Sequence, residues 1–166
     1  MTTRVEPARA FAGYTDEDVP LRGYAALITG FATATGSILV AASRRGLPDR
    51  IAPADLALLA VGTHHLSRLL TKDKVTAVMR APFAHYEGRG APGEVEERPR
   101  GHGVRLAAGE LLTCPYCTGQ WVALGMVGGL LVAPRVTRTL ASVLAVSAAS
   151  DVLQILYKAA DRLRTG

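Results

Sequence analysis

Long uncharged apolar runs alternate with short charged segments along most of this chain. The longest run, 111–134, has no charged residue over 24 positions, and a second run, 23–43, has none over 21. As helices, both runs are long enough to cross a bilayer core of about 30 Å. Two further apolar segments, 52–70 and 139–157, contain a few polar side chains. The pattern therefore predicts an all-α integral membrane protein with about four transmembrane helices.

The segments outside these runs are polar. Residues 1–20 are expected to form a flexible N-terminal tail, and 21–166 a single helical membrane domain. Within the cytoplasmic loop predicted at 71–105, the apolar residues of 71–83 recur every three or four positions beside lysine and arginine. That spacing is typical of an amphipathic helix lying in the headgroup region. Residues 84–103 are rich in Gly, Pro, Glu and Arg, which favours a flexible loop.

Composition and charge agree with a membrane protein. The chain of 166 residues is 49% hydrophobic but only 5% aromatic, so small and aliphatic residues supply most of the apolar mass. Small residues let transmembrane helices approach closely, and Gly125 and Gly129 have the spacing of such a contact. The formal net charge is +5, but the charges lie in blocks between apolar runs, unlike the basic face of a nucleic-acid-binding protein. We therefore expect the lipid bilayer, and no nucleic acid, as a partner.

The distribution of lysine and arginine predicts the orientation of the chain in the membrane. With four spans, both termini and the loop 71–105 lie on one side, which then carries 13 of these residues. The opposite side carries 5. Because positively charged segments stay in the cytoplasm, we expect cytoplasmic N- and C-termini.

Polar side chains from three predicted spans are expected at the same depth, near the inner face. They are His64, His65, Arg68, Glu110, Cys114, Cys117, Gln120 and Asp151. An ionisable group inside a membrane usually has a partner, so we expect Arg68 to pair with Asp151 or Glu110. A small transporter component that uses Asp55, His64 and Asp151 is an alternative function.

Cys114 and Cys117 are the only cysteines, and they form a Cys-Pro-Tyr-Cys tetrad at the start of the third predicted span. On a helix they share a face, and a helix N-terminus stabilises a thiolate. Three hypotheses stay open: small side chains that pack the start of a helix, a thiol–disulfide exchange site, or a zinc site. His64, His65 or a second copy of the pair in a homo-oligomer would complete the zinc shell. The tetrad also resembles the active site of glutaredoxins, although the strand and soluble sheet of that fold are not predicted here.

Two stretches carry further motifs, SRLLTKDKVTAVMRAPF at 67–83 and GELLTCPYCTGQWVAL at 109–124. The motif residues are Lys72, Asp73, Val75, Thr76, Arg80, Pro82 and Phe83, then Glu110, Cys114, Pro115, Cys117, Gly119 and Trp121. Together they resemble an uncharacterised family of bacterial membrane proteins, domain-of-unknown-function family 1360, which includes a sporulation-associated member. The resemblance implies a small multi-pass protein of the bacterial cytoplasmic membrane and assigns no reaction. It also implies that Asp73, Thr76, Arg80 and Glu110 share an inner-face structure, in which we hypothesise that Arg80 reaches Glu110.

The expected function is a structural or partner-binding membrane module rather than an enzyme, because the chain has no nucleophile–base arrangement and no phosphate-binding glycine loop. Its partner would be a second copy or another membrane protein. The first alternative is a membrane thiol redox or zinc-binding protein that uses Cys114 and Cys117.

Overall fold

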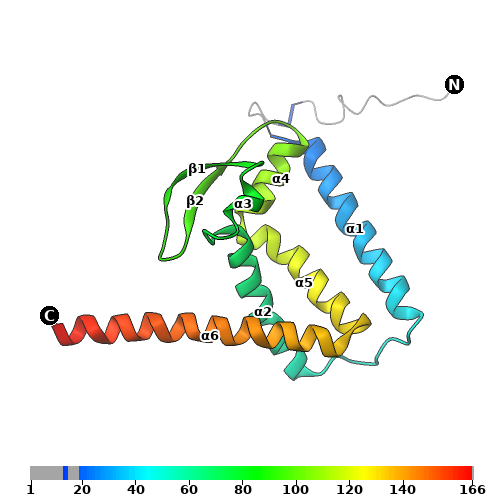
Figure 1. The fold of residues 1–166 in the computed structure, drawn as a ribbon. Coiled ribbons are helices and arrows are strands. Elements are labelled where there is room, and N and C mark those ends of the chain that lie inside the picture. Colours follow the sequence, from blue (N-terminus) through cyan, green and yellow to red (C-terminus); the bar gives the residue numbers. More distant parts are fainter. Residues whose placement is uncertain (1–12, 15–18, 166) are drawn as a thin grey trace.

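The computed structural model describes residues 13–14 and 19–165, and the fold is predominantly helical, at 71%. Most of the predicted tail, 1–20, lies outside the described residues. The elements in chain order are α1 (Leu21–Ser43), α2 (Pro53–Thr71), α3 (Ala77–Arg80), β1 (Ala84–Arg89), β2 (Val95–Pro99), α4 (Val104–Thr113), α5 (Pro115–Val132) and α6 (Pro134–Thr165) (Figure 1). The predicted helical class is confirmed, with a two-stranded sheet added to it.

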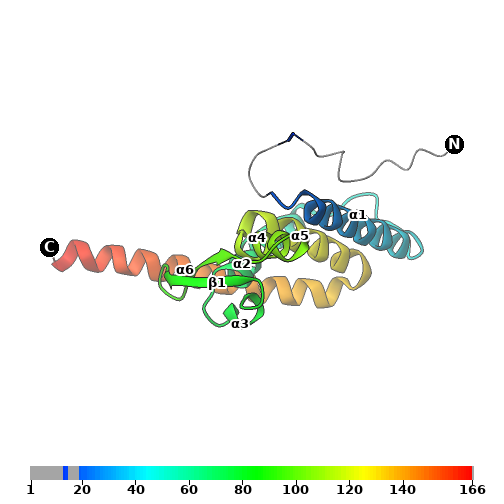
Figure 2. The same ribbon diagram turned by 90° about the horizontal axis from the view of Figure 1, so that it is seen from above.

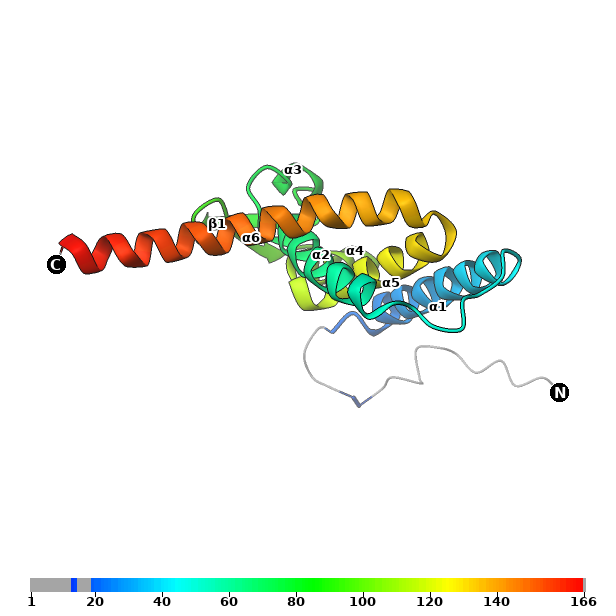
Figure 3. The same ribbon diagram turned by 90° about the horizontal axis from the view of Figure 1, so that it is seen from below.

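Helices α2 and α5 form the middle of the molecule, with α1 on one side of them and α6 on the other (Figure 2, Figure 3). Helix α2 packs along α5 and α6, while α1 packs on α4 and α5. The buried core consists of Leu59, Val122, Met126, Leu130 and Ala141. The second half of α6 extends beyond this core, and all its described side chains from 151 to 164 are exposed.

Close helix contacts use small residues, but not the pair that the sequence indicated. A Cβ at Gly125 would meet nothing within 4 Å. In contrast, a Cβ at Gly128 would lie 2.7 Å from Ile38 of α1, and one at Gly129 would lie 2.7 Å from Thr137 of α6. The predicted Gly125 and Gly129 contact is therefore wrong at Gly125, and Gly128 takes its place between α5 and α1.

The predicted third span, 111–134, is not one helix. Helix α4 ends at Thr113, Cys114 is extended with φ −108° and ψ 108°, and α5 begins at Pro115. The residue before a proline is driven from the α region, and proline fits the first turn of a new helix. A proline also separates α5 from α6. Helix α6 begins at Pro134 and continues past the predicted end at 157.

In the part of the chain that the structure describes, two helices are long and apolar enough to cross a membrane, Leu21–Ser43 in α1 and Pro134–Arg164 in α6. Four transmembrane helices are not supported. Helix α2 carries several ionisable side chains, and the break at Cys114 removes two apolar leucines, Leu111 and Leu112, from the start of α5.

The predicted flexible loop at 84–103 is instead an antiparallel hairpin of β1 and β2, with a bulge between Tyr86 and Gly88. Backbone bonds attach the hairpin to the segment that follows α2. The N–H of Lys74 donates to the Gly93 carbonyl, and the N–H of Val95 donates to the Lys72 carbonyl, both at 2.9 Å. The hairpin is thus fixed to the end of α2, which its glycine-rich and charged sequence did not indicate.

The predicted amphipathic helix over 71–83 is reduced to the single turn of α3. In a soluble protein the charged side chains of such a segment face outward and the apolar ones face inward. Here Arg80 is buried, while Val75, Val78 and Met79 are exposed. The Thr76 hydroxyl donates to the backbone carbonyl of Leu69 at 2.5 Å, which folds the segment back onto the end of α2. A longer helix would have to break this return contact.

Candidate functional site

A pocket of about 570 Å³ lies between α1, α4 and α5, and both cysteines line it. The other lining side chains that matter here are Tyr24, Phe31, Glu110, Gln120 and Trp121. Phe31 and Trp121 meet edge to face, with ring centroids 5.3 Å apart. A mainly apolar pocket with a few polar groups is the usual form of a small-molecule site.

The break between α4 and α5 determines the geometry of the cysteine pair. Cys114 is the N-cap residue of α5, and its sulfur accepts the backbone N–H of Cys117 at 3.3 Å. The Cys117 thiol also donates to the Cys114 sulfur, with the two Sγ atoms 2.6 Å apart. Both cysteines are free, Cys117 is exposed and Cys114 is half-buried. Cys114 is therefore the sulfur that receives hydrogen bonds, and Cys117 is the sulfur that supplies one.

Glu110 stands one turn before the cysteine pair, on α4. Its Oε2 accepts a hydrogen bond from the Tyr24 hydroxyl of α1 at 2.5 Å. Nearby, the backbone of α1 approaches α4 closely, since a Cβ at Gly23 would lie 2.6 Å from the Cβ of Ala107. This contact holds one wall of the pocket. The hypothesis that Arg80 reaches Glu110 is wrong, because each has a different partner.

Arg80 is completely buried, at 0% exposure, and its guanidinium closes the end of α2. Nη1 donates to the Leu70 carbonyl at 2.8 Å, and Nη2 donates to the Asp73 carbonyl at 2.9 Å. Nε forms an ion pair with Glu97 of β2, which is 6% exposed. Helix C-termini carry unsatisfied carbonyls and partial negative charge, so a buried cation there is well placed.

This arrangement explains why the first motif combines lysine, aspartate, threonine and arginine. Arg80 also donates to the Thr76 hydroxyl at 2.7 Å, and the Asp73 carboxylate accepts the backbone N–H of Val75 at 2.8 Å. Lys72 pairs with Glu96 of the hairpin at 3.0 Å. The motif therefore builds the junction between α2 and the hairpin, and none of these side chains lines the cysteine pocket.

The remaining predicted polar residues of α2 and α6 do not gather at the cysteines. Arg68 pairs with Glu94 of the hairpin, so the predicted pairing with Asp151 or Glu110 is wrong. His65 Nδ1 lies 3.6 Å from the Asp151 carboxylate. His64 lines a separate pocket of about 510 Å³ between α2 and α5. Gln120 is the one predicted residue that lines both pockets.

The residues named for a transporter are also separated. Asp55 forms a two-point contact with Arg138 of α6, with N–O distances of 2.8 Å and 2.7 Å. Neither Asp55 nor Asp151 lines the pocket that contains His64. These three side chains therefore do not share a path between the helices.

Within residues 13–14 and 19–165, no three His, Cys, Asp or Glu side chains are grouped so that they could hold a metal ion. His64 faces the other pocket, and His65 lies beside Asp151. Hence the geometry does not favour a zinc site that combines the cysteine pair with either histidine of the same chain.

Three important side chains were not identified from sequence. Tyr24 and Phe31 reach the cysteine pocket from α1, and Glu97 reaches Arg80 from the hairpin. A weak signal existed for Tyr24 and Phe31, because aromatic residues are scarce in this chain. Glu97 gave no signal, since it lies in a run of charged residues that resembles a solvated loop.

Comparisons with known proteins agree with the two motifs. Residues 58–157 match the family described as "Protein of unknown function (DUF1360)", and this range includes both motif stretches. Sporulation protein YjcA of Bacillus subtilis (strain 168) is 33% identical over 104 residues, which are 61% of this chain and 88% of the relative. UPF0713 protein YngL of the same organism is 28% identical over 109 residues, 64% of this chain and 80% of the relative. No solved structure matches the chain significantly. The family resemblance is confirmed.

Proposed function

We propose that this chain, which belongs to the DUF1360 family of proteins of unknown function, is a multi-pass protein of the bacterial cytoplasmic membrane that serves as a structural or partner-binding module. The observation that carries the proposal is the exposure of α1 and α6, the two described helices that are long and apolar enough to cross a membrane. Only 6% of the apolar window in α1, and 6% of that in α6, is buried within the chain. The core helix of a soluble protein is mostly buried, whereas a lipid-facing helix need not be.

Helix length supports the same proposal. The 23 residues of α1 extend about 34 Å at 1.5 Å per residue, which exceeds a hydrocarbon core of about 30 Å. Ile28 of α1 and Val146 of α6 are each 70% exposed. In water such side chains would form a large apolar surface, so lipid is their favourable environment.

Helices α2 and α5 are proposed to lie in the same membrane layer, because each packs between α1 and α6. The ionisable groups of α2 have partners, as membrane-embedded charges require. Asp55 is matched by Arg138, and Arg68 by Glu94. Paired charges lower the cost of placing this helix beside lipid.

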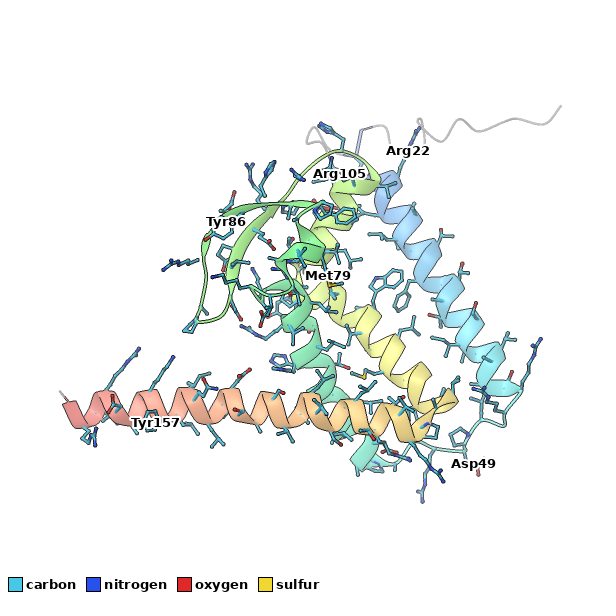
Figure 4. The ribbon with its side chains drawn as sticks, in the orientation of Figure 1. Arg22, Asp49, Met79, Tyr86, Arg105 and Tyr157 are labelled. Atoms are coloured by element: carbon cyan, nitrogen blue, oxygen red, sulfur yellow. The ribbon has the colours of Figure 1, made fainter. Side chains whose placement is uncertain are left out.

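The proposed orientation rests on the excess of lysine and arginine at one end, because the loop around Asp49 carries only Arg44, Arg45 and Arg50. Arg22, at the start of α1, and Arg105, on α4, lie at one end of the molecule, while Asp49 lies at the other (Figure 4). The hairpin lies at the same end as Arg105, whose guanidinium donates to the Pro82 carbonyl before β1. By the positive-inside rule, we propose that this end and both termini are cytoplasmic.

The turn at α3 adds a contact with the membrane surface. Val78 and Met79 are exposed beside Lys74, while the polar Thr76 and Arg80 face inward. Exposed apolar side chains next to lysine suit the boundary between headgroups and acyl chains. We propose that α3 rests in this layer on the cytoplasmic side.

The partner-binding surface is proposed to be the projecting half of α6. Leu153, Ile155 and Tyr157 are exposed there, and they belong to a stretch that α2 and α5 do not cover. Within a bilayer, a second copy or another membrane protein would pack along this stretch. The name of one relative connects the family with sporulation, so a membrane assembly formed during that process is a suitable setting.

Side-specific labelling tests the membrane proposal. Single cysteines at Leu47, Ala91 and Arg164 would be introduced into a chain that carries Cys114→Ser and Cys117→Ser, and intact bacterial spheroplasts treated with an impermeant maleimide. We expect labelling of the Leu47→Cys variant from outside, and of the other two only after the membrane is permeabilised. Extraction of the protein by alkaline carbonate, or labelling of all three positions from one side, would refute the proposal.

A further inference from the structure

We propose that Cys114 and Cys117 form a thiol–disulfide exchange site, in which the Cys114 sulfur attacks a disulfide held in the pocket between α1, α4 and α5. This activity goes beyond the membrane role proposed above. Two free cysteines whose Sγ atoms are 2.6 Å apart need little movement to form a disulfide with each other. The pair lines a pocket of about 570 Å³, which is large enough for a small ligand.

The hydrogen bonds distinguish the two sulfurs. Cys114 accepts from the backbone N–H of Cys117 and from the Cys117 thiol, so its sulfur is the one toward which both neighbouring donors point. It also caps the N-terminus of α5, an 18-residue helix whose positive end favours negative charge. Cys117 keeps its proton in this arrangement. The geometry therefore assigns the attack to Cys114 and the second, resolving step to Cys117.

Each step of the exchange balances with a disulfide substrate of the form R–S–S–R′. The Cys114 thiolate attacks one substrate sulfur, the substrate S–S bond breaks, and R′–S⁻ leaves and takes up a proton. Cys117 then loses its proton and attacks the Cys114 sulfur of the mixed disulfide, which releases R–S⁻. Two electrons pass from the cysteine pair to the substrate, leaving a Cys114–Cys117 disulfide that a cytoplasmic dithiol would reduce again.

The pocket lining indicates the class of disulfide. Phe31 and Trp121 supply aromatic walls, while the Glu110 carboxylate is fixed by the Tyr24 hydroxyl. A fixed negative charge beside the reacting sulfurs repels anionic substrates. We infer that the site prefers a neutral, aromatic or apolar disulfide. The reducing direction depends on the cytoplasmic orientation proposed above, but the reaction itself does not.

The experiment uses the full chain in detergent, reduced and then freed of reductant. Its reaction with a neutral dipyridyl disulfide is followed by the absorbance of the released thione, and compared with a dianionic bis(nitrobenzoate) disulfide. We expect two equivalents of thione per chain and an internal disulfide in the wild type. The Cys117→Ser variant should release one equivalent at a rate within about threefold of wild type, and Cys114→Ser should react about tenfold more slowly.

Charge selection is tested in the same assay. The Glu110→Gln variant should lose most of the preference for the neutral disulfide, whereas the matched control Asp49→Asn, in an exposed loop, should keep it. Alkylation of the wild type with less than one equivalent of iodoacetamide, followed by peptide mapping, gives a second measurement that needs no variant. Cys114 should be modified first.

Three results would overturn the proposal: equal or reversed reactivity of the two single variants, preferential alkylation of Cys117, or a wild-type rate equal to that of the denatured chain. Because the assay is carried out in detergent, these results are independent of membrane topology. Failure of the labelling experiment would instead leave the thiol chemistry intact and remove only the membrane proposal.

Discussion

Replacing Arg80 should disrupt the junction between α2 and the hairpin. In Arg80→Met, the side chain keeps an unbranched apolar stem but loses the guanidinium and with it every donor. The carbonyls of Leu70 and Asp73 then lose the guanidinium as a donor, and the Glu97 carboxylate stays almost fully buried without a counter-charge. Removing one member of a buried ion pair costs about 3–5 kcal/mol, because the remaining charge is left desolvated. This is a large part of a total stability of about 5–15 kcal/mol.

A double-mutant cycle distinguishes the observed pairing of Arg80 with Glu97 from the pairing with Glu110 that the sequence suggested. Since Arg80 and Glu97 contact each other directly, the Arg80→Met/Glu97→Met double variant should cost about 2 kcal/mol less than the sum of the two single variants. Arg80 and Glu110 have different partners, so Arg80→Met and Glu110→Gln should be additive within about 0.5 kcal/mol.

The assay is equilibrium unfolding in mixed detergent micelles, with helix content followed by circular dichroism. Helix content before unfolding confirms that each variant starts from the native fold. Additive costs for Arg80 and Glu97, or strong coupling between Arg80 and Glu110, would refute the arrangement at the end of α2.

Two further predictions concern helix packing. Gly109→Ala should destabilise the protein by about 1–3 kcal/mol in thermal unfolding, because the new Cβ would lie 2.5 Å from the Phe83 carbonyl oxygen. Gly125→Ala, with open space around it, should be neutral or stabilising by up to about 1 kcal/mol, and equal losses at both sites would contradict the packing. Asp55→Arg or Arg138→Asp alone should loosen α2 from α6 and speed proteolysis, while the charge-swapped double variant should recover resistance. A swap no better than either single variant would show that the pair does not join these helices.

The helical class could be predicted because uncharged runs and prolines determine helices and their ends through residues that are close together in the sequence. The run that became α1 has no charge from 23 to 43, and Pro53 starts α2 as proline commonly starts a helix. The break at Cys114 also had a local signal, Pro115, but the length of the uncharged run outweighed it in our prediction. A hydropathy profile depends only on the order of residues along the chain, so it does not detect where one helix ends and another begins in a new direction.

The hairpin and the ion pairs could not be predicted in the same way. The β2 strand, VEERP, is mostly charged and has little strand propensity. It is held by bonds to Lys72 and Arg80, which lie more than fifteen residues earlier in the chain. Only the folded chain brings these groups together, so Arg80 was matched to the wrong acid.

The cysteine site was predicted in part. The tetrad, Gln120 and Trp121 lie within eight residues of one another at the start of α5, and they were identified together from their spacing. The opposite wall comes from α1, with Tyr24 separated from Glu110 by 86 positions. A local pattern cannot report a partner at that distance along the chain.

The central claim is that the exposed apolar faces of α1 and α6 lie in lipid. Spin labels at Ile28 and Val146, in a chain without its native cysteines and reconstituted in lipid nanodiscs, test it directly by collision with oxygen and with a polar nickel complex. We expect oxygen to reach both labels more readily than nickel, and a control label at Ala91 in the hairpin to show the opposite order. If the labels at Ile28 and Val146 behave like the label at Ala91, those helices face water and the membrane proposal is wrong.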